Sequence, residues 1–94
     1  MSGRSIIWSA EARANLIAIR AYIAEFSPGA AERVALALLE AAESLDRLPH
    51  RGRPVGDDRR ELVVIWPYLI RYRVSERQVI ILRIRHGAQE PQRP

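Results

Sequence analysis

Residues 61–86, ELVVIWPYLIRYRVSERQVIILRIRH, decide the fold, because their side chains follow the period of a β-strand rather than that of a helix. Residues 61–66 are a near-continuous apolar run that ends in a Trp-Pro-Tyr corner. Residues 69–74 and 79–86 alternate between apolar residues and arginine, with a short polar turn between them. The stretch therefore predicts three consecutive antiparallel strands.

The pairing of the last two strands is constrained by which side chains can share a buried face. In an antiparallel pair the numbers of opposite residues have a constant sum, and an odd sum would bring arginines onto the apolar face. Even sums of 154 or 156 avoid this, and 154 fits the turn. It predicts the pairs Val74–Ile80, Tyr72–Leu82, Ile70–Ile84, Arg71–Arg83 and Leu69–Arg85. The core face of the last strand would then carry Ile80, Leu82, Ile84 and His86.

Four arginines fall on the opposite face of these strands: Arg71, Arg73, Arg83 and Arg85. Like charges directly opposite one another destabilise a sheet, so the cluster is easier to explain if an anionic partner covers it. In the alternative interpretation the guanidinium groups stay solvated and their stems lie flat on the sheet.

Two apolar stripes with helical spacing precede the strands. Ser9 is a good N-cap for the first helix, which we expect to end near Phe26, and Ser27 and Pro28 can begin the second, which Pro49 closes. The stripes are Ala12, Leu16, Ile19, Ile23 and Phe26, then Ala31, Val34, Leu38, Ala41, Leu45 and Leu48. With a short β-prone run at residues 5–8, the predicted class is α+β, in the order β-α-α-β-β-β. A two-helix hairpin packs on one face of an antiparallel sheet.

Length and composition limit the possible functions. The 94 residues fit a single domain, with an ordered core at about 5–88 and a polar tail at 88–94. There is no cysteine and there are two histidines, so we expect neither a metal site nor a cofactor. No apolar run reaches the about 20 residues that cross a bilayer, and no signal-peptide core is visible, so we expect a cytoplasmic protein without a membrane partner.

The charge is unevenly distributed. All 15 basic residues are arginine, and residues 49–94 carry 10 of them against 5 acidic residues. A basic half of this kind attracts a polyanion or an acidic protein segment. Sequence-specific DNA binding is disfavoured, because the polar faces of both helices are mixed or acidic.

The order of the segments resembles the RelE/ParE superfamily of bacterial type II toxins. WSAEARANLIAIRAYI (residues 8–23) is similar to the family's first helix, and four further segments follow in the family's order. They are PHRGRP (49–54), RREL (59–62), YLIRYRV (68–74) and VIILRIRHG (79–87). The resemblance covers roughly residues 5–88 and implies a hetero-oligomer with a cognate antitoxin whose acidic, amphipathic C-terminal segment wraps the toxin. We expect that segment to cover the basic sheet surface or the adjacent helical groove, or to add a strand at an exposed edge of the sheet.

The superfamily implies two alternative activities. RelE-like members cleave mRNA on the ribosome, whereas the resemblance implies that ParE-like members poison DNA gyrase without being nucleases. RelE-type sites use lysine, arginine and a C-terminal tyrosine, but this chain has no lysine, and Gly87 stands where an aromatic residue is often found. We therefore favour the ParE-like reading, with DNA gyrase as the target and the ribosome as the alternative.

Two residue sets follow from these readings. In the ribonuclease alternative the catalytic candidates are Arg60, Glu61, Arg83, Arg85 and His86. A histidine base with an arginine clamp is chemically possible, although a histidine at this strand end is more often a packing residue. The candidates for binding the antitoxin or the target are Arg51, Arg53, Arg60, Arg71, Arg73, Arg83 and Arg85.

Overall fold

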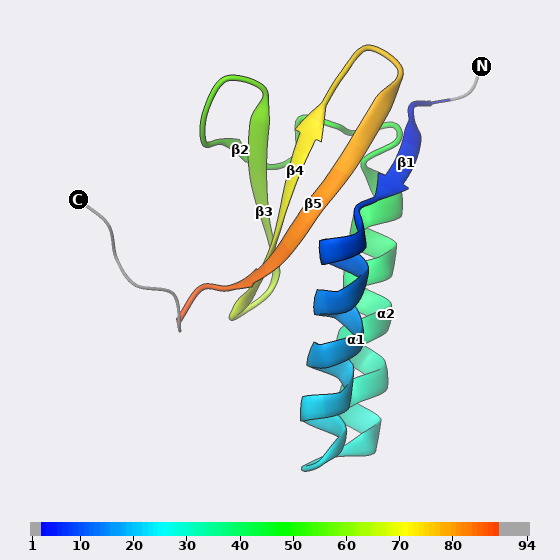
Figure 1. Cartoon of the computed structure of the whole chain (residues 1–94), viewed down its shortest axis with the longest axis vertical. Helices are drawn as coiled ribbons and strands as arrows, with labels where there is room; N and C mark the ends of the chain where they lie inside the picture. The colour runs from blue at the N-terminus through cyan, green and yellow to red at the C-terminus, as the bar shows by residue number, and fades with distance from the viewer. Residues whose placement is uncertain (1–2, 89–94) are drawn as a thin grey trace.

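The computed structural model describes residues 3–88 as a helical hairpin packed against one face of a sheet (Figure 1). Residues 89–94, which include most of the predicted polar tail, lie outside the described residues. The elements are β1 (Ser5–Trp8), α1 (Ala10–Ala24), α2 (Pro28–Ser44), β2 (Arg53–Pro54), β3 (Arg59–Ile65), β4 (Tyr68–Val74) and β5 (Gln78–His86). Within the described part of the chain, no helix is long and apolar enough to span a membrane.

The sheet has the strand order β1-β5-β4-β3-β2. The predicted α+β class and the helical hairpin on one face are confirmed. The sheet is mixed rather than purely antiparallel, because β1 runs parallel to β5, from Ser5 opposite Gln78 to Trp8 opposite Ile81. A short strand, β2, lies between α2 and β3 and pairs antiparallel with β3.

The register of β4 and β5 agrees with the prediction over half its length. Ile70 lies opposite Ile84 and Arg71 opposite Arg83, as the sum of 154 requires. The register then shifts by one residue, so Tyr72 pairs with Ile81 rather than with Leu82. This irregularity brings Val79 and Ile81 onto the core face, both 0% exposed, so the predicted core positions of Ile80 and Leu82 are wrong. Arg83 and Arg85 stay off the core face because the shift lies between them and the turn. Arg71 and Arg73 stay off it because β4 keeps its alternation on either side of the buried Tyr72.

Both helices begin where the serines predict. The Ser9 side chain accepts a hydrogen bond from the Ala12 N–H, and the Ser27 side chain accepts one from the Ala30 N–H. The helices end earlier than predicted, at Ala24 and Ser44. Phe26 and Leu48 are therefore not core residues, being 73% and 57% exposed.

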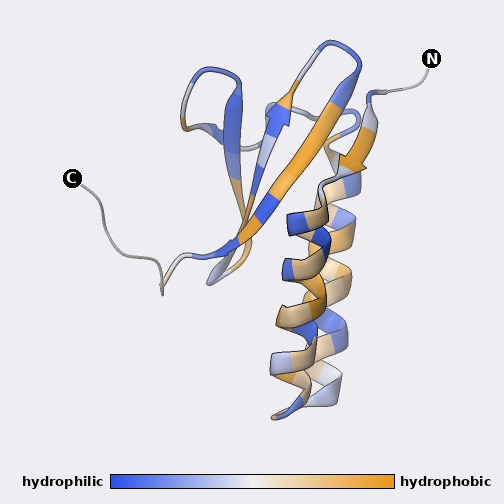
Figure 2. Ribbon diagram, in the orientation of Figure 1, coloured by the Kyte–Doolittle hydropathy of each residue, from blue (hydrophilic) through white to orange (hydrophobic). Residues whose placement is uncertain are grey.

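The core fills the layer between the hairpin and the sheet. Leu38 of α2 and Leu45, which caps the end of that helix, meet Ile70, Tyr72 and Ile81 from the sheet, and all five are 0% exposed. Hydrophobic residues run along β1 and over much of β5, the strand that lies against α1 (Figure 2). The opposite face of the sheet is thus left to the charged residues of β3, β4 and β5.

Candidate functional site

A buried carboxylate organises the outer face of the sheet. The strand register places Glu61 of β3 beside Arg71 of β4, which in turn lies opposite Arg83 of β5. Glu61 is only 3% exposed. Its Oε2 accepts hydrogen bonds from Arg71 Nε at 3.0 Å and Nη2 at 2.7 Å, and a further one from Arg85. Arg53 Nη2 lies 3.6 Å from Oε1.

This arrangement keeps Glu61 ionised. Burial alone would raise the pKa of its carboxyl, but the hydrogen bonds and positive charges of Arg71 and Arg85 outweigh burial and hold the pKa below its usual value. The expectation that an external anion must explain the arginine cluster is therefore incomplete, because the chain supplies a carboxylate of its own. Three guanidinium groups share one carboxylate, which leaves this cluster with a net positive charge.

The Arg60 side chain contacts the loop before β2 rather than Glu61. Its Nη1 donates to the backbone carbonyl of Gly52 at 2.7 Å and lies 3.5 Å from that of His50. Arg60 therefore holds the loop before β2 against β3. It does not join the cluster around Glu61.

His86 lies on the helix side of the sheet. Its ring packs edge-to-face on Tyr68, with the centroids 5.2 Å apart. The two rings border a small cavity of about 260 Å³, lined by Asn15, Ala18, Ile19, Tyr22, Tyr68, Ile84 and His86. Burial, together with the nearby Tyr22 hydroxyl, raises the pKa of Tyr68. This pocket was not predicted, because α1 and β5 are distant in sequence.

The five ribonuclease candidates are thus not brought together. Glu61 and Arg85 share an ion pair on the outer face, with Arg83 near them on β5. His86 follows Arg85 in the same strand, so its side chain points to the opposite face. A base at His86 and an arginine clamp at Arg83 and Arg85 would be separated by the sheet itself.

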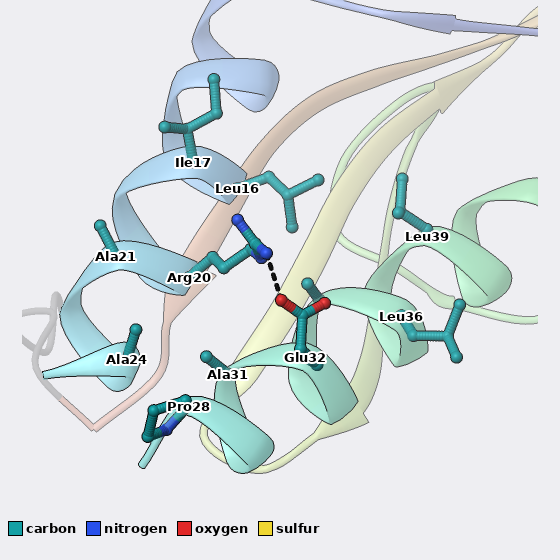
Figure 3. Close-up of a pocket in the computed structure, with 11 residues that line it drawn as sticks. Leu16, Ile17, Arg20, Ala21, Ala24, Pro28, Ala31, Glu32, Leu36 and Leu39 are labelled. Atoms are coloured by element: carbon teal, nitrogen blue, oxygen red, sulfur yellow. Dashed lines mark hydrogen bonds and ion pairs between the residues drawn. The ribbon is translucent and has the colours of Figure 1, made fainter. Parts of the chain in front are cut away.

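The outer surface of the helical hairpin carries an apolar groove (Figure 3). The groove has a volume of about 670 Å³ and lies between α1 and α2. Ile17, Leu36 and Leu39 along it are 70%, 55% and 40% exposed. An ion pair between Arg20 and Glu32 joins the two helices across it. A second cavity of about 560 Å³ shares Ile17 and Leu39 and extends the apolar surface to β1. The sequence signal is the set of apolar residues that lie off the two core stripes.

Comparison with known proteins identifies relatives over nearly the whole chain. Residues 6–91 match the family described as ParE toxin of type II toxin-antitoxin system, parDE. Toxin RelE2 of Caulobacter vibrioides is 53% identical over 83 residues, which cover 88% of this chain and 94% of that protein. Toxin RelE1 of the same bacterium is 33% identical over 89 residues, covering 92% of this chain and 96% of that protein.

Solved structures agree on the fold. The chromosomal ParDE toxin-antitoxin system from P. aeruginosa contains a chain that superposes with a TM-score of 0.76 at 28% identity, covering 88% of this chain and 95% of that one. A chain of the RelBE2 toxin-antitoxin complex from Mycobacterium tuberculosis superposes with a TM-score of 0.65 at 23% identity, covering 89% and 98%, a likeness of fold alone.

Proposed function

The chain belongs to the ParE toxin family of type II toxin–antitoxin systems, within the RelE/ParE superfamily, and from this premise we propose that it acts by binding a macromolecular target rather than by cleaving RNA. We propose DNA gyrase as the first target to test. The cytoplasm, where gyrase and ribosomes are found, is where we expect the toxin to act.

The burial of Glu61 and its hydrogen bonds with Arg71 and Arg85 are the observation that supports this proposal. A general base must reach the proton that it removes. Glu61 is 3% exposed and already accepts hydrogen bonds from Arg71 and Arg85. Cleavage without a metal also needs the base and the cations to reach the same phosphodiester, so they must share one surface of the protein. His86 and Arg85 instead point to opposite faces of β5.

A RelE-like, ribosome-dependent mRNA endoribonuclease is the second candidate. The names of the relatives favour it over gyrase inhibition, because the protein that is 53% identical is a RelE toxin. In this reading Arg83 and Arg85 would hold the phosphate, and His86 would have to change its side of the sheet or be replaced by a group on the ribosome.

Paired assays with the purified toxin decide between the two candidates. We expect inhibition of supercoiling by gyrase, together with intact mRNA on stalled ribosomes. Cleavage of mRNA at A-site codons with unaffected supercoiling would reverse the order of the candidates. If mRNA is cleaved, the same assay with the Arg83→Ala variant tests whether cleavage depends on the outer face of the sheet.

We also propose that a cognate antitoxin neutralises the toxin by covering two surfaces. An amphipathic helix would fill the hairpin groove, because Ile17, Leu36 and Leu39 offer it apolar contacts. An acidic continuation would reach the basic outer face. The best-placed contacts there are Arg53 and Arg73, whose side chains are 71% and 41% exposed, compared with 18% for Arg85. Arg51, Arg60, Arg71 and Arg83 complete the proposed basic set.

The groove part of this proposal has a direct test. Leu36→Asp places a charge in the groove without touching the core, and we expect it to weaken antitoxin binding by about 100-fold or more. Glu40→Gln, on the exposed face of the same helix, is the matched control and should change binding less than about twofold. Equal affinities for Leu36→Asp and the wild type would show that the antitoxin binds elsewhere.

A further inference from the structure

The loop that joins α2 to β2 presents a rigid basic surface, which we call the knuckle (residues 47–53). Pro49 and Gly52 are buried, whereas the five other residues are exposed. These exposed residues are Arg47, Leu48, His50, Arg51 and Arg53. The loop is therefore fastened at two points and turns its remaining side chains outward.

The two buried residues are held by one tyrosine. The Tyr72 hydroxyl, 0% exposed, donates to the Pro49 carbonyl at 2.8 Å and accepts from the Gly52 N–H at 2.9 Å. Arg60 binds the Gly52 carbonyl at 2.7 Å from the other side. A Cβ on Gly52 would lie 2.6 Å from the Glu61 carbonyl oxygen, so only glycine permits this close approach. Because the loop backbone is already ordered, binding a partner through it costs little additional entropy.

The exposed side chains surround one apolar residue with cations. Leu48 is 57% exposed, and residues 47–53 contain three arginines and no acidic residue. A cavity of about 340 Å³ beside Leu48 is lined by Arg47, Leu48, Pro49, His50 and Arg51. Arg51 is steadied by a hydrogen bond of 2.6 Å from its Nη1 to the Ser44 hydroxyl. An apolar centre with charged surroundings is the usual anatomy of a protein–protein contact.

We propose that the knuckle is the contact through which this toxin holds its target, and that it takes an acidic protein surface with one apolar side chain inserted beside Leu48. This inference rests on the proposed function. A nucleic-acid partner is disfavoured, because the knuckle has no Phe, Tyr or Trp on which successive bases could stack and has the apolar Leu48 at its centre. Seven residues are too few for a whole interface of about 20–30 residues a side, so the knuckle is an anchor within a larger contact.

The knuckle and the hairpin groove lie towards opposite ends of α2. The groove begins at Pro28, at the start of the helix, and the knuckle follows Ser44, at its end. Substitutions in the knuckle therefore test target binding without altering the groove proposed for the antitoxin.

Two knuckle variants and one control test the inference by growth arrest after induction in a bacterial host. Arg47→Glu with Arg51→Glu reverses the charge, and Leu48→Asn removes the apolar centre. The control, Arg33→Glu with Arg77→Glu, changes the net charge equally at exposed positions elsewhere. We expect the inducer level needed for arrest to rise at least about tenfold for the charge variant, about fivefold for Leu48→Asn and less than twofold for the control. Circular dichroism and urea denaturation check that each variant remains folded.

Several outcomes would overturn the inference. Full toxicity of both knuckle variants, or an equal loss in the control, would show that the knuckle is not the contact. If both knuckle variants were unfolded, the loop would be assigned to folding instead of target binding. If a 12-nucleotide RNA bound the wild type and not the charge variant, the partner would be a nucleic acid. A wild-type chain that arrests no growth overturns the proposed function and the inference together, whereas toxic knuckle variants overturn the inference alone.

Discussion

Replacement of Glu61 by glutamine should strongly destabilise the fold. The change keeps the shape of the side chain but removes its charge, which leaves Arg71 and Arg85 without their shared counter-ion. Removing one partner of a buried ion pair costs about 3–5 kcal/mol. Arg85 is 18% exposed but Arg71 is 32% exposed, so water screens part of the loss. We therefore expect the free energy of unfolding to fall by about 3 kcal/mol at pH 7, at the low end of that range.

Urea denaturation followed by circular dichroism measures this loss. With an m-value of about 1.5 kcal/mol/M, a loss of about 3 kcal/mol lowers the midpoint by about 2 M urea. The pH dependence has a defined sign, because the pKa of Glu61 is lowered in the folded chain. Its stabilisation is complete above the unfolded pKa of about 4.3 and is lost as the pH falls through the folded pKa. The difference between wild type and variant should therefore shrink between pH 5 and pH 3.

Glu32→Gln is the matched control for Glu61→Gln. Glu32 also pairs with an arginine, but the side chains of this pair are 65% and 54% exposed. An exposed pair contributes about 0–1 kcal/mol, so the control should lose less than about 1 kcal/mol. If the two variants lost the same free energy, or if the Glu61→Gln difference stayed constant down to pH 3, the claim that burial makes this cluster stabilising would be wrong.

Three further substitutions test the loop and the strand end. Tyr72→Phe removes the hydroxyl that bonds Pro49 and Gly52, so we expect the free energy of unfolding, measured by urea denaturation, to fall by about 1–3 kcal/mol. An unchanged urea midpoint would contradict the double hydrogen bond. Gly52→Ala forces a Cβ to 2.6 Å from the carbonyl oxygen of Glu61 in β3, which would displace the knuckle. We expect the free energy of unfolding, measured by the same denaturation, to fall by about 2 kcal/mol or more. His86→Ala removes the edge-to-face contact with Tyr68 and should cost about 1 kcal/mol while toxicity persists. Loss of toxicity at unchanged stability would instead favour the ribonuclease candidate.

Local signals explain why the elements were predictable. Helical spacing and the capping serines Ser9 and Ser27 depend on neighbours within four residues, so the helix starts were found. The register of β4 and β5 was found only where arginine alternates with apolar residues. Residues 79–82 are all apolar, so either parity can face the core, and nothing in that run forbids the shift at Leu82.

The charge cluster was missed for a different reason. Glu61, Arg71 and Arg85 come from three strands, and their meeting depends on two registers at once. The available signal was Glu61, the one acidic residue of β3, β4 and β5, and pairing it with the arginines of the same face would have found the cluster. The lining of the hairpin groove was predicted only in part, because Ile17 was not assigned to either helical stripe.

Glu61 also determines what the outer face can bind. Arg71 and Arg85 direct their guanidinium groups at its carboxylate, so a phosphate that arrives there competes with a bound anion that cannot leave. A catalytic arginine clamp works because its donors are free to meet charge that develops in the transition state. Arginines whose donors are already bonded to a carboxylate stabilise such a transition state less. Their remaining positive charge still gives the surface a positive potential. That potential speeds encounter with an acidic protein surface. The geometry of this ion cluster supports the proposal that the outer face recognises a partner rather than cleaving a phosphodiester.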